Sequence, residues 1–402
     1  MAQGFDPQAA TAAYLATLTP AQHALAKAYT QGGYWVLLWA TLIGILVSWI
    51  VIQTGVLVRI RAGVEARRPH PWLAVLAVVA ADTLIEGVLM TPWDTYAHWW
   101  REKSYGLTSQ AFPGWLSQHL LGLVLGTVEF LILLSLLYGL IRRAPRTWWA
   151  WSGLLVGLGF IVALLIQPVV IEPLFNTYKP APPGPMRDEV MAMGRQVGVP
   201  TDKILIYNGS QQSNRYTANV SGVGSTARVA LSDTMSKKDA DLAEVRGVVG
   251  HEMGHYIRGD IYLLATFTGL FAMVVFFLID RLFPWTARMM RAKGVTGLAD
   301  PAGYPVATVL FSVIALLATP LTNTFSRWGE SGADRFSLEN FNEPDGMAKA
   351  LVKTVEYRAA TPSKAEEFIF YDHPAVGTRI RRAMDWKATH PKAQLPSDSP
   401  AS

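Results

Sequence analysis

Residues 34–58 read YWVLLWATLIGILVSWIVIQTGVLV, an unbroken run without a charged side chain. A helix of about 20 predominantly apolar residues crosses the hydrocarbon core of a bilayer, so this run is long enough to span a membrane. Five further segments are predominantly apolar over similar lengths, namely 72–92, 115–141, 147–171, 261–279 and 302–325. Together they predict an α-helical multi-pass membrane protein with about six spans.

The composition of the 402-residue chain agrees with this fold class. Hydrophobic residues make up 51% and charged residues 16%, whereas a soluble domain carries about 25% charge. The absence of cysteine excludes a disulfide scaffold and any thiolate metal site. The net charge is only +5, and no basic cluster is interleaved with aromatic residues, so nucleic acid is not an expected partner.

The segments outside the spans predict a small α+β domain built from two blocks. In the first block we expect a helix over 186–197, strands over 203–207 and 227–231, and a capping box at 236–239 that opens a helix running to about residue 258. The expected organisation is an N-terminal surface segment (1–33) with a helix at 7–29, four spans (34–171), an extramembrane block (172–260), two spans (261–325), a C-terminal block (326–387) and a disordered tail (388–402).

The last helix of the first block contains His251-Glu252-Met253-Gly254-His255. Histidines at positions i and i+4 project from one face of a helix, so both imidazoles can reach one Zn²⁺ ion. Glu252 then lies beside the metal-bound water, where its carboxylate can accept a proton during attack on a peptide carbonyl. The pattern predicts a zinc-dependent peptidase with one Zn²⁺ per chain.

A catalytic zinc ion needs a third protein ligand. Asp260 follows the helix directly, but an acid at that position is equally typical of the flank of a membrane span. A stronger candidate is the segment Glu330-Ser331-Gly332-Ala333-Asp334, which comes after the last span. Glu330 is expected to bind the metal, and Asp334 to accept the free N–H of a ligand histidine and fix its tautomer.

The order of these elements resembles the integral-membrane zinc metalloendopeptidases of the CAAX prenyl protease 1 type. Shorter stretches, at 101–110, 172–176, 227–234 and 373–380, resemble segments of the same family. The resemblance implies that His251, His255 and Glu330 are the ligands and that Glu252 is the base. It also implies that the partners are the lipid bilayer and peptide or protein substrates, including prenylated ones.

The resemblance further places His373 and Arg379 near the cleft, where they are expected to stabilise the oxyanion. The family holds the substrate backbone on an edge strand by β-augmentation. Its Asn-Ala-Tyr pattern is not intact here, where residues 216–222 read YTANVSG, and Asn219 is the candidate substitute.

Three acids fall inside the expected spans, namely Asp82, Glu86 and Glu129. Acids are costly in hydrocarbon and therefore face protein or water. The resemblance implies a water-filled chamber that they line, and the alternative is pairing between helices.

The orientation in the membrane and the biological role stay open at this stage. Short-loop Lys and Arg gather in 59–71, 142–146 and 280–301, which the positive-inside rule places in the cytoplasm. That rule puts the peptidase blocks outside, whereas the resembled family has them in the cytosol. The alternatives to CAAX processing are membrane-protein quality control, a transporter with a structural zinc, and a binding protein that captures tails without cutting them. The expected location is a bacterial inner membrane or an endoplasmic-reticulum-type membrane.

Overall fold

The computed structural model describes residues 4–68, 70–215, 217–222, 226–237 and 241–390, which fold into two compact units. Unit 1 comprises 1–31, 168–260 and 320–402, and unit 2 comprises 32–167 and 261–319. The expected boundaries 33/34, 171/172, 260/261 and 325/326 lie within six residues of the unit boundaries at 31/32, 167/168, 260/261 and 319/320. The N-terminal segment differs, because it belongs to unit 1 and is not a separate element.

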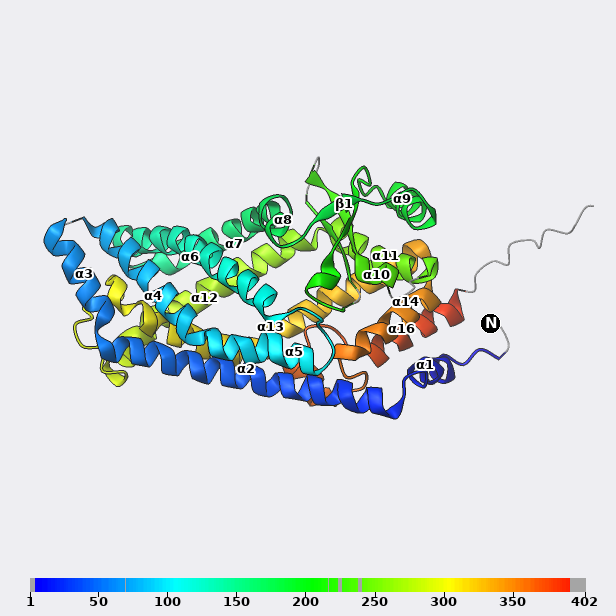
Figure 1. The fold of residues 1–402 in the computed structure, drawn as a ribbon, viewed down its shortest axis with the longest axis horizontal. Helices are drawn as coiled ribbons and strands as arrows, with labels where there is room; N and C mark the ends of the chain where they lie inside the picture. Colours follow the sequence, from blue (N-terminus) through cyan, green and yellow to red (C-terminus); the bar gives the residue numbers. More distant parts are fainter. Residues whose placement is uncertain (1–3, 69, 216, 223–225, 238–240, 391–402) are drawn as a thin grey trace, which may run out of the picture. The chain divides into compact units, whose positions relative to one another are not determined.

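Six helices in the described part of the chain are long and apolar enough to cross a membrane, which confirms the predicted spans. Their bounds are Pro20–Thr54, Pro71–Ser104, Phe112–Arg143, Trp148–Phe175, Asp260–Met289 and Pro301–Phe341. In the labels of Figure 1 they are α2 (Pro20–Thr54), α4–η1–α5 (Pro71–Asp94, Thr95–Trp100, Arg101–Ser104), α6 (Phe112–Arg143), α7–η2–α8 (Trp148–Ile166, Gln167–Ile171, Glu172–Phe175), α12 (Asp260–Met289) and η5–α13 (Pro301–Gly303, Tyr304–Phe341).

The first apolar run is longer than the span it forms. Gly55 adopts a left-handed conformation with φ of 61°, so α2 ends at Thr54 and a shorter helix, α3 (Val56–Arg67), begins after it. Glycine takes this conformation without the steric cost that a side chain would add. The residues after Gly55 therefore belong to a separate helix and not to the first span.

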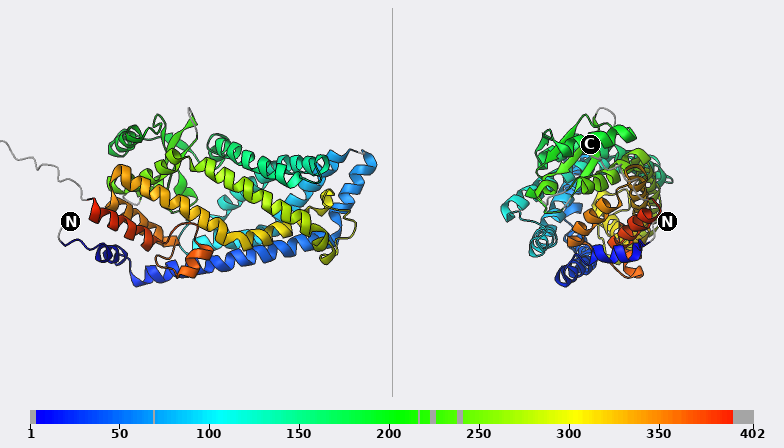
Figure 2. Two further views of the ribbon diagram at one scale, coloured as in Figure 1. Left: turned by 180° about the vertical axis from the view of Figure 1, so that it is seen from behind. Right: turned by 90° about the vertical axis from the view of Figure 1, so that its right-hand side faces the viewer.

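In unit 2, α7 and α12 approach each other at small residues. A Cβ atom on Gly153 would lie 2.7 Å from the Gly269 carbonyl oxygen, and one on Gly157 would lie 3.1 Å from the Ala265 carbonyl oxygen. Glycines four residues apart allow helix backbones in a membrane to pack closely. The views in Figure 2 agree that these two helices lie side by side.

Unit 1 contains one four-stranded sheet with the order β1-β2-β4-β3. The strands are β1 (Tyr178–Pro180), β2 (Ile204–Tyr207), β3 (Ala218–Ser221) and β4 (Arg228–Ser232). β2 and β4 are parallel, and β1 and β3 add antiparallel edges. The two predicted strands, β2 and β4, form the centre of the sheet, while the short edge strands were not predicted.

Around this sheet lie α9 (Pro185–Val197), η3 (Gly209–Gln211), α10 (Asp233–Lys237) and α11 (Leu242–Arg258). α9 matches its prediction, but the predicted start of α11 is wrong. Asp241 caps α11 by accepting a hydrogen bond from the Glu244 N–H at 2.8 Å. The proposed capping box at 236–239 falls partly on residues outside those described, and its first residue belongs to the separate helix α10.

The C-terminal block forms α14 (Pro344–Lys353), η6 (Thr354–Tyr357), α15 (Lys364–Phe370) and α16 (Val376–Thr389). The expected tail at 388–402 starts too early, since α16 continues to Thr389, and residues 391–402 lie outside those described.

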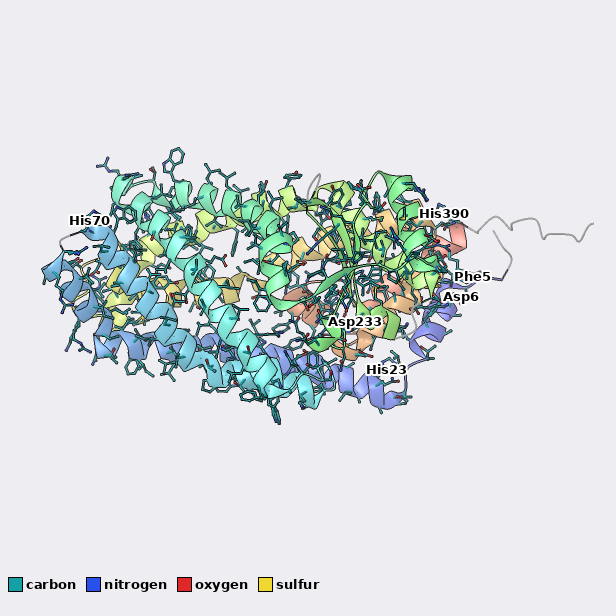
Figure 3. The ribbon with its side chains drawn as sticks, turned by 45° about the horizontal axis from the view of Figure 1, so that its top comes forward. Phe5, Asp6, His23, His70, Asp233 and His390 are labelled. Atoms are coloured by element: carbon teal, nitrogen blue, oxygen red, sulfur yellow. The ribbon has the colours of Figure 1, made fainter. Side chains whose placement is uncertain are left out.

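The predicted helix at 7–29 is also wrong, because α1 (Pro7–Leu15) ends before α2 begins. α1 packs against α16 through a shared apolar cluster and does not lie on the surface by itself. Figure 3 labels Phe5 and His390 near the ends of these two helices.

Candidate active site

The two histidines of α11 face each other on one side of the helix. Their Nε2 atoms lie 3.2 Å apart, and the planes of their rings are nearly perpendicular. The helix ends at Gly259, which adopts a left-handed conformation with φ of 65°. This places both imidazoles in the last two turns of α11, beside the residues that follow it in the chain.

The C-terminal part of α13 brings Glu330 to these histidines. A carboxylate oxygen of Glu330 lies 3.2 Å from His251 Nε2, and the other lies 3.4 Å from His255 Nε2. The approach depends on small residues, because a Cβ atom on Gly254 would lie 3.1 Å from the Ala333 Cα and carbonyl oxygen. Gly254 lies in the HExxH motif, and Ala333 lies in the segment 330–334. Each motif therefore supplies proposed ligands and also one side of the close helix contact that aligns them.

A carboxylate stands behind each histidine. Asp334 Oδ1 lies 2.9 Å from His251 Nδ1. Asp260 Oδ2 lies 2.7 Å from His255 Nδ1. From its place in the sequence Asp260 was a candidate ligand or an acid flanking a membrane span, and its contact with His255 was not predicted. A glycine at the end of the helix, Gly259, is the feature of the sequence that could have predicted this contact, because the turn there folds Asp260 back toward His255.

These contacts fit a metal ion bound by three residues. With the protons on Nδ1, both Nε2 lone pairs point toward each other and toward the Glu330 carboxylate, which is repulsive unless a cation lies among them. In addition, Glu330 Oε2 is buried and accepts no hydrogen bond of regular geometry among the described residues, although the Nε2 atoms of His251 and His373 lie 3.2 and 3.1 Å from it. The observed separations of 3.2–3.4 Å match the edge of a tetrahedron with Zn–N bonds of about 2.0–2.1 Å, which is about 3.3 Å. His251, His255 and Glu330 thus suit a metal that takes nitrogen and oxygen ligands.

The electrostatic field at this position also favours positive charge. Burial opposes protonation of His251, but its contacts with Asp334 and Glu330 prevail and raise its pKa to about 9. For His255 burial is likewise outweighed, by Asp260 and Glu330, and its pKa rises to about 10. The carboxylates that stabilise the protonated imidazoles would also stabilise a divalent cation bound in place of those protons.

Glu252 lines a cavity of about 220 Å³ together with His251, and burial raises the pKa of its carboxyl group. The cavity is also lined by Asp334, His373 and Arg379. The histidine and arginine predicted near the cleft are therefore both present in the same cavity as the candidate base.

His373 and Arg379 make different contacts within the site. His373 Nε2 lies 3.1 Å from Glu330 Oε2, and its Nδ1 lies 2.9 Å from Asp372 Oδ1. Arg379 is buried and donates two hydrogen bonds to Asp334, at 2.7 and 2.6 Å. The guanidinium group is thus engaged with the carboxylate that supports His251, in a bidentate ion pair.

β3 forms an edge of the sheet next to the cavity. Thr217 and Ala218 line the cavity. Asn219 follows in β3, opposite Ala230 of β4, and it is not among the cavity-lining residues. Tyr216 lies outside the described residues.

The three intramembrane acids belong to unit 2 and differ in environment. Asp82 is completely buried, and neither of its carboxylate oxygens has a hydrogen-bond partner among the described residues. The chamber-lining position expected for Asp82 stays a prediction, beside the alternative of pairing between helices. Glu86 accepts a hydrogen bond from Ser48 at 2.6 Å, and Glu129 is exposed on α6.

Two family profiles match the chain in consecutive regions. Residues 183–391 match the profile described as peptidase family M48. Residues 7–177 match the profile described as the CAAX prenyl protease N-terminal region with five membrane helices. In that region this chain has four helices, among the described residues, that are long and apolar enough to span a membrane.

Curated proteins and a solved structure are similar over most of the chain. An uncharacterized metalloprotease of Bacillus subtilis, YhfN, is 28% identical over 85% of this chain and 81% of that protein. CAAX prenyl protease 1 of Saccharomyces cerevisiae is 23% identical over 73% of this chain and 68% of that protein. The crystal structure of S. mikatae Ste24p has the same fold, with a TM-score of 0.74 at 19% identity over 92% of this chain and 90% of that one.

Proposed function

This chain belongs to peptidase family M48 and is a multi-pass membrane metalloprotease, and we propose that one zinc ion per chain, held by His251, His255 and Glu330, serves its peptide hydrolysis. The observation that supports this proposal is the convergence of three ligand atoms at zinc-like separations, with a carboxylate behind each histidine. A bound zinc ion supplies a water molecule whose pKa is lowered toward about 7.

The residues around the metal position would each have a separate role in peptide hydrolysis. Glu252, which lines the cavity, accepts a proton on its carboxylate and delivers it to the leaving amine nitrogen. We assign to His373, whose Nε2 lies 3.1 Å from Glu330 Oε2, the donation of Nε2–H to the oxygen of the scissile carbonyl. Arg379 is a positioning residue, because its guanidinium holds Asp334 and Asp334 in turn holds His251.

The edge strand β3 offers a place for the substrate backbone. Its outer edge pairs with no other strand among the described residues, and its first residue, Ala218, lines the cavity together with the preceding Thr217. We propose that an extended peptide pairs with this edge through the outward-facing main-chain groups of Ala218 and Val220, because the N–H and C=O groups of Asn219 between them face Ala230 of β4. The side chain of Asn219 is not needed in this arrangement, which explains how the family pattern can differ here.

The lining of the cavity favours a C-terminal tail as the substrate. Met347, Ala350 and Leu351 form an aliphatic wall, and Arg358 adds a partly exposed cation 3.9 Å from Asp372. Aliphatic side chains next to a free carboxylate are the chemical features of a CAAX-type tail. We therefore propose cleavage of such tails, with a prenylated cysteine as the additional membrane-anchored determinant.

The proposal is tested with detergent-purified protein and four reporter peptides that end in a CAAX sequence. The peptides are prenylated or unprenylated, and each has a free or an amidated C-terminus. We expect fastest cleavage of the prenylated peptide with a free carboxylate, and a loss of about 10²–10⁴-fold in Glu252→Gln. Equal cleavage of all four would indicate a general membrane endopeptidase. No cleavage by zinc-loaded protein would reject the proposed function.

A further inference from the structure

A second cavity, of about 530 Å³, lies in unit 2 between the end of α12 and the loop that follows it. Three cationic side chains line it, namely Arg288, Arg291 and Lys293. Within the described residues none of the three has an ion-pair or hydrogen-bond partner for its side chain. Asp280 is the carboxylate in the lining, and it accepts a hydrogen bond from Trp148 Nε1 at 2.8 Å. The cavity thus contains positive charge that the protein does not neutralise.

The floor of this cavity is apolar. Phe283 is buried in a cluster of unit 2, and Ala287, Val295 and Leu298 pack against that cluster. All four line the cavity together with the cations. A ligand that fits such a lining combines an anionic group with an adjoining apolar part.

The loop is held in place by contacts with α2 and α3, which are part of the same unit. Gln53 Nε2 donates to the Met290 carbonyl oxygen at 2.7 Å, and Arg61 Nη2 donates to the Gly294 carbonyl oxygen at 3.2 Å. Arg61 also forms an ion pair with buried Asp300. These contacts fix both ends of the loop, so its cations are held around the cavity in advance of binding.

Arg291 provides further evidence that the loop conformation is specific. It is one of two non-glycine residues in the described chain with a positive φ, at 52°. Side chains seldom adopt this conformation, because it brings Cβ close to the following carbonyl oxygen. The strain is tolerated where the surrounding contacts hold the backbone firmly.

The position of the cavity indicates the source of the ligand. α12 is a membrane span, and the cavity lies at its C-terminal end. Trp285 and Met289 on the same turn are more than half exposed, as expected for side chains at the level of lipid headgroups. The loop also belongs to the side of the membrane on which Lys and Arg gather in short loops.

We propose that this cavity binds the anionic headgroup of a phospholipid, with its phosphate among Arg288, Arg291 and Lys293. The glycerol and the first methylene groups would lie against Phe283 and Leu298. Basic pockets between membrane helices are suited to such headgroups, since each cation contributes attraction in a region of low dielectric constant. The site is separate in its residues from the metal site and from the proposed peptide cavity.

The test measures lipid binding to the full-length protein in detergent, by native mass spectrometry and by thermal shift. The probes are phosphatidylglycerol, phosphatidylcholine and inorganic phosphate. We expect phosphatidylglycerol to bind more tightly than phosphatidylcholine. Each single Gln substitution at the three cations should weaken phosphatidylglycerol binding about fivefold, and Arg288→Gln/Arg291→Gln/Lys293→Gln should abolish the preference.

A matched control removes the same amount of charge from the same side of the membrane. Arg59→Gln/Arg67→Gln/Arg143→Gln changes three exposed arginines that do not line the cavity, and it should keep the preference for phosphatidylglycerol. Equal loss in both triple variants would overturn the site, since it would show only general charge attraction. An equal effect of inorganic phosphate would overturn the lipid assignment. If the triple variant fails to fold, Lys293→Gln alone decides, and unchanged binding in that variant contradicts the proposal.

Discussion

At the scale of single residues, the two histidines proposed as ligands each contact a carboxylate through Nδ1, and the two carboxylates come from different elements. Asp334 lies on α13, and Asp260 begins α12. Each accepts the Nδ1 proton and leaves Nε2 directed at the metal position. Such partners also raise the basicity of the ligands, so both should contribute to metal affinity.

Replacing Asp260 by Ala is expected to lower zinc affinity by about 10–100-fold, because His255 loses the acceptor that fixes its tautomer. Competition with a chromophoric zinc chelator measures this effect. Asp202→Ala serves as the control, since Asp202 is an exposed acid of the same unit away from the site. Wild-type affinity in Asp260→Ala would show that the contact does not support the ligand.

The proposed ligands and Asp334 follow from local spacing in the sequence, whereas the other contacts around the histidines do not. In a helix, the spacing of the HExxH motif places its two histidines on one face. Glu330 and Asp334 have the same i, i+4 spacing, so they too were expected to share a helix face. Asp260 was missed because its role depends on the turn at Gly259. The ion pair of Arg379 with Asp334 depends on the packing of α16, which no local pattern specifies.

At the scale of helices, the backbones of α11 and α13 approach closely because the residues of α11 at their contact are glycines. A Cβ atom on Gly250 would lie 2.6 Å from Ser337 Oγ, and one on Gly254 would lie 3.1 Å from Ala333. Ala333 is itself completely buried. The distance between the histidines and Glu330 is therefore set by backbone contact between the two helices.

Gly254→Val is expected to force these helices apart and to lower zinc affinity at least tenfold, with destabilisation of about 1–3 kcal/mol from overpacking. Gly254→Ala should show a smaller effect in the same direction. Gly329→Val is the matched control, because a Cβ atom there meets nothing within 4 Å. Metal content and thermal unfolding in detergent report both effects, and an equal loss in the control would contradict this explanation.

The cap of α11 gives a pH-dependent prediction. The hydrogen bond from Lys349 lowers the pKa of Asp241 below its usual 3.8. The ionised carboxylate thus stabilises the fold at pH values above the pKa of the unfolded chain, and this stability is lost as the pH falls through the folded pKa. Asp241→Ala should cost about 1 kcal/mol at pH 7, and the difference from wild type should narrow below about pH 4. A difference that does not change with pH would exclude the ionised cap as its cause.

The long elements were predictable and the short ones were not. The six spans were visible from hydrophobic length alone, and β2 and β4 from their β-branched and aliphatic residues. The strands β1 and β3 have only three and four residues, so pairing with neighbours determines them more than local sequence does. The start of α11 was misplaced because a capping pattern at Ser236 resembled the cap that Asp241 provides.

At the scale of the whole molecule, segments far apart in the sequence build unit 1. Residues near both ends of the described chain share one apolar cluster, in which Ala26, Ile380 and Met384 are buried. Tyr14 on α1 donates a hydrogen bond to Asp345 Oδ1 at 2.7 Å, and Lys387 contacts the same carboxylate. No local pattern predicts this contact, since the apolar residues of α1 equally suit a membrane surface.

Tyr14→Ala is expected to destabilise the protein by about 2 kcal/mol, because it removes ring packing and a hydrogen bond to a charged group. Thermal unfolding in detergent measures the change. Gln8→Ala, an exposed position on the same helix, should stay within about 0.5 kcal/mol of wild type. If the two variants behave alike, α1 does not contribute to unit 1 through this face.

The most direct test of the central claim measures zinc content and peptide cleavage in the same preparations of wild type, Glu252→Gln and Glu330→Ala. We predict about one zinc per chain in wild type and Glu252→Gln, with cleavage in wild type alone, and loss of both zinc and cleavage in Glu330→Ala. Cleavage by Glu252→Gln at the wild-type rate, or full zinc content in Glu330→Ala, would contradict the assignment of base and ligand.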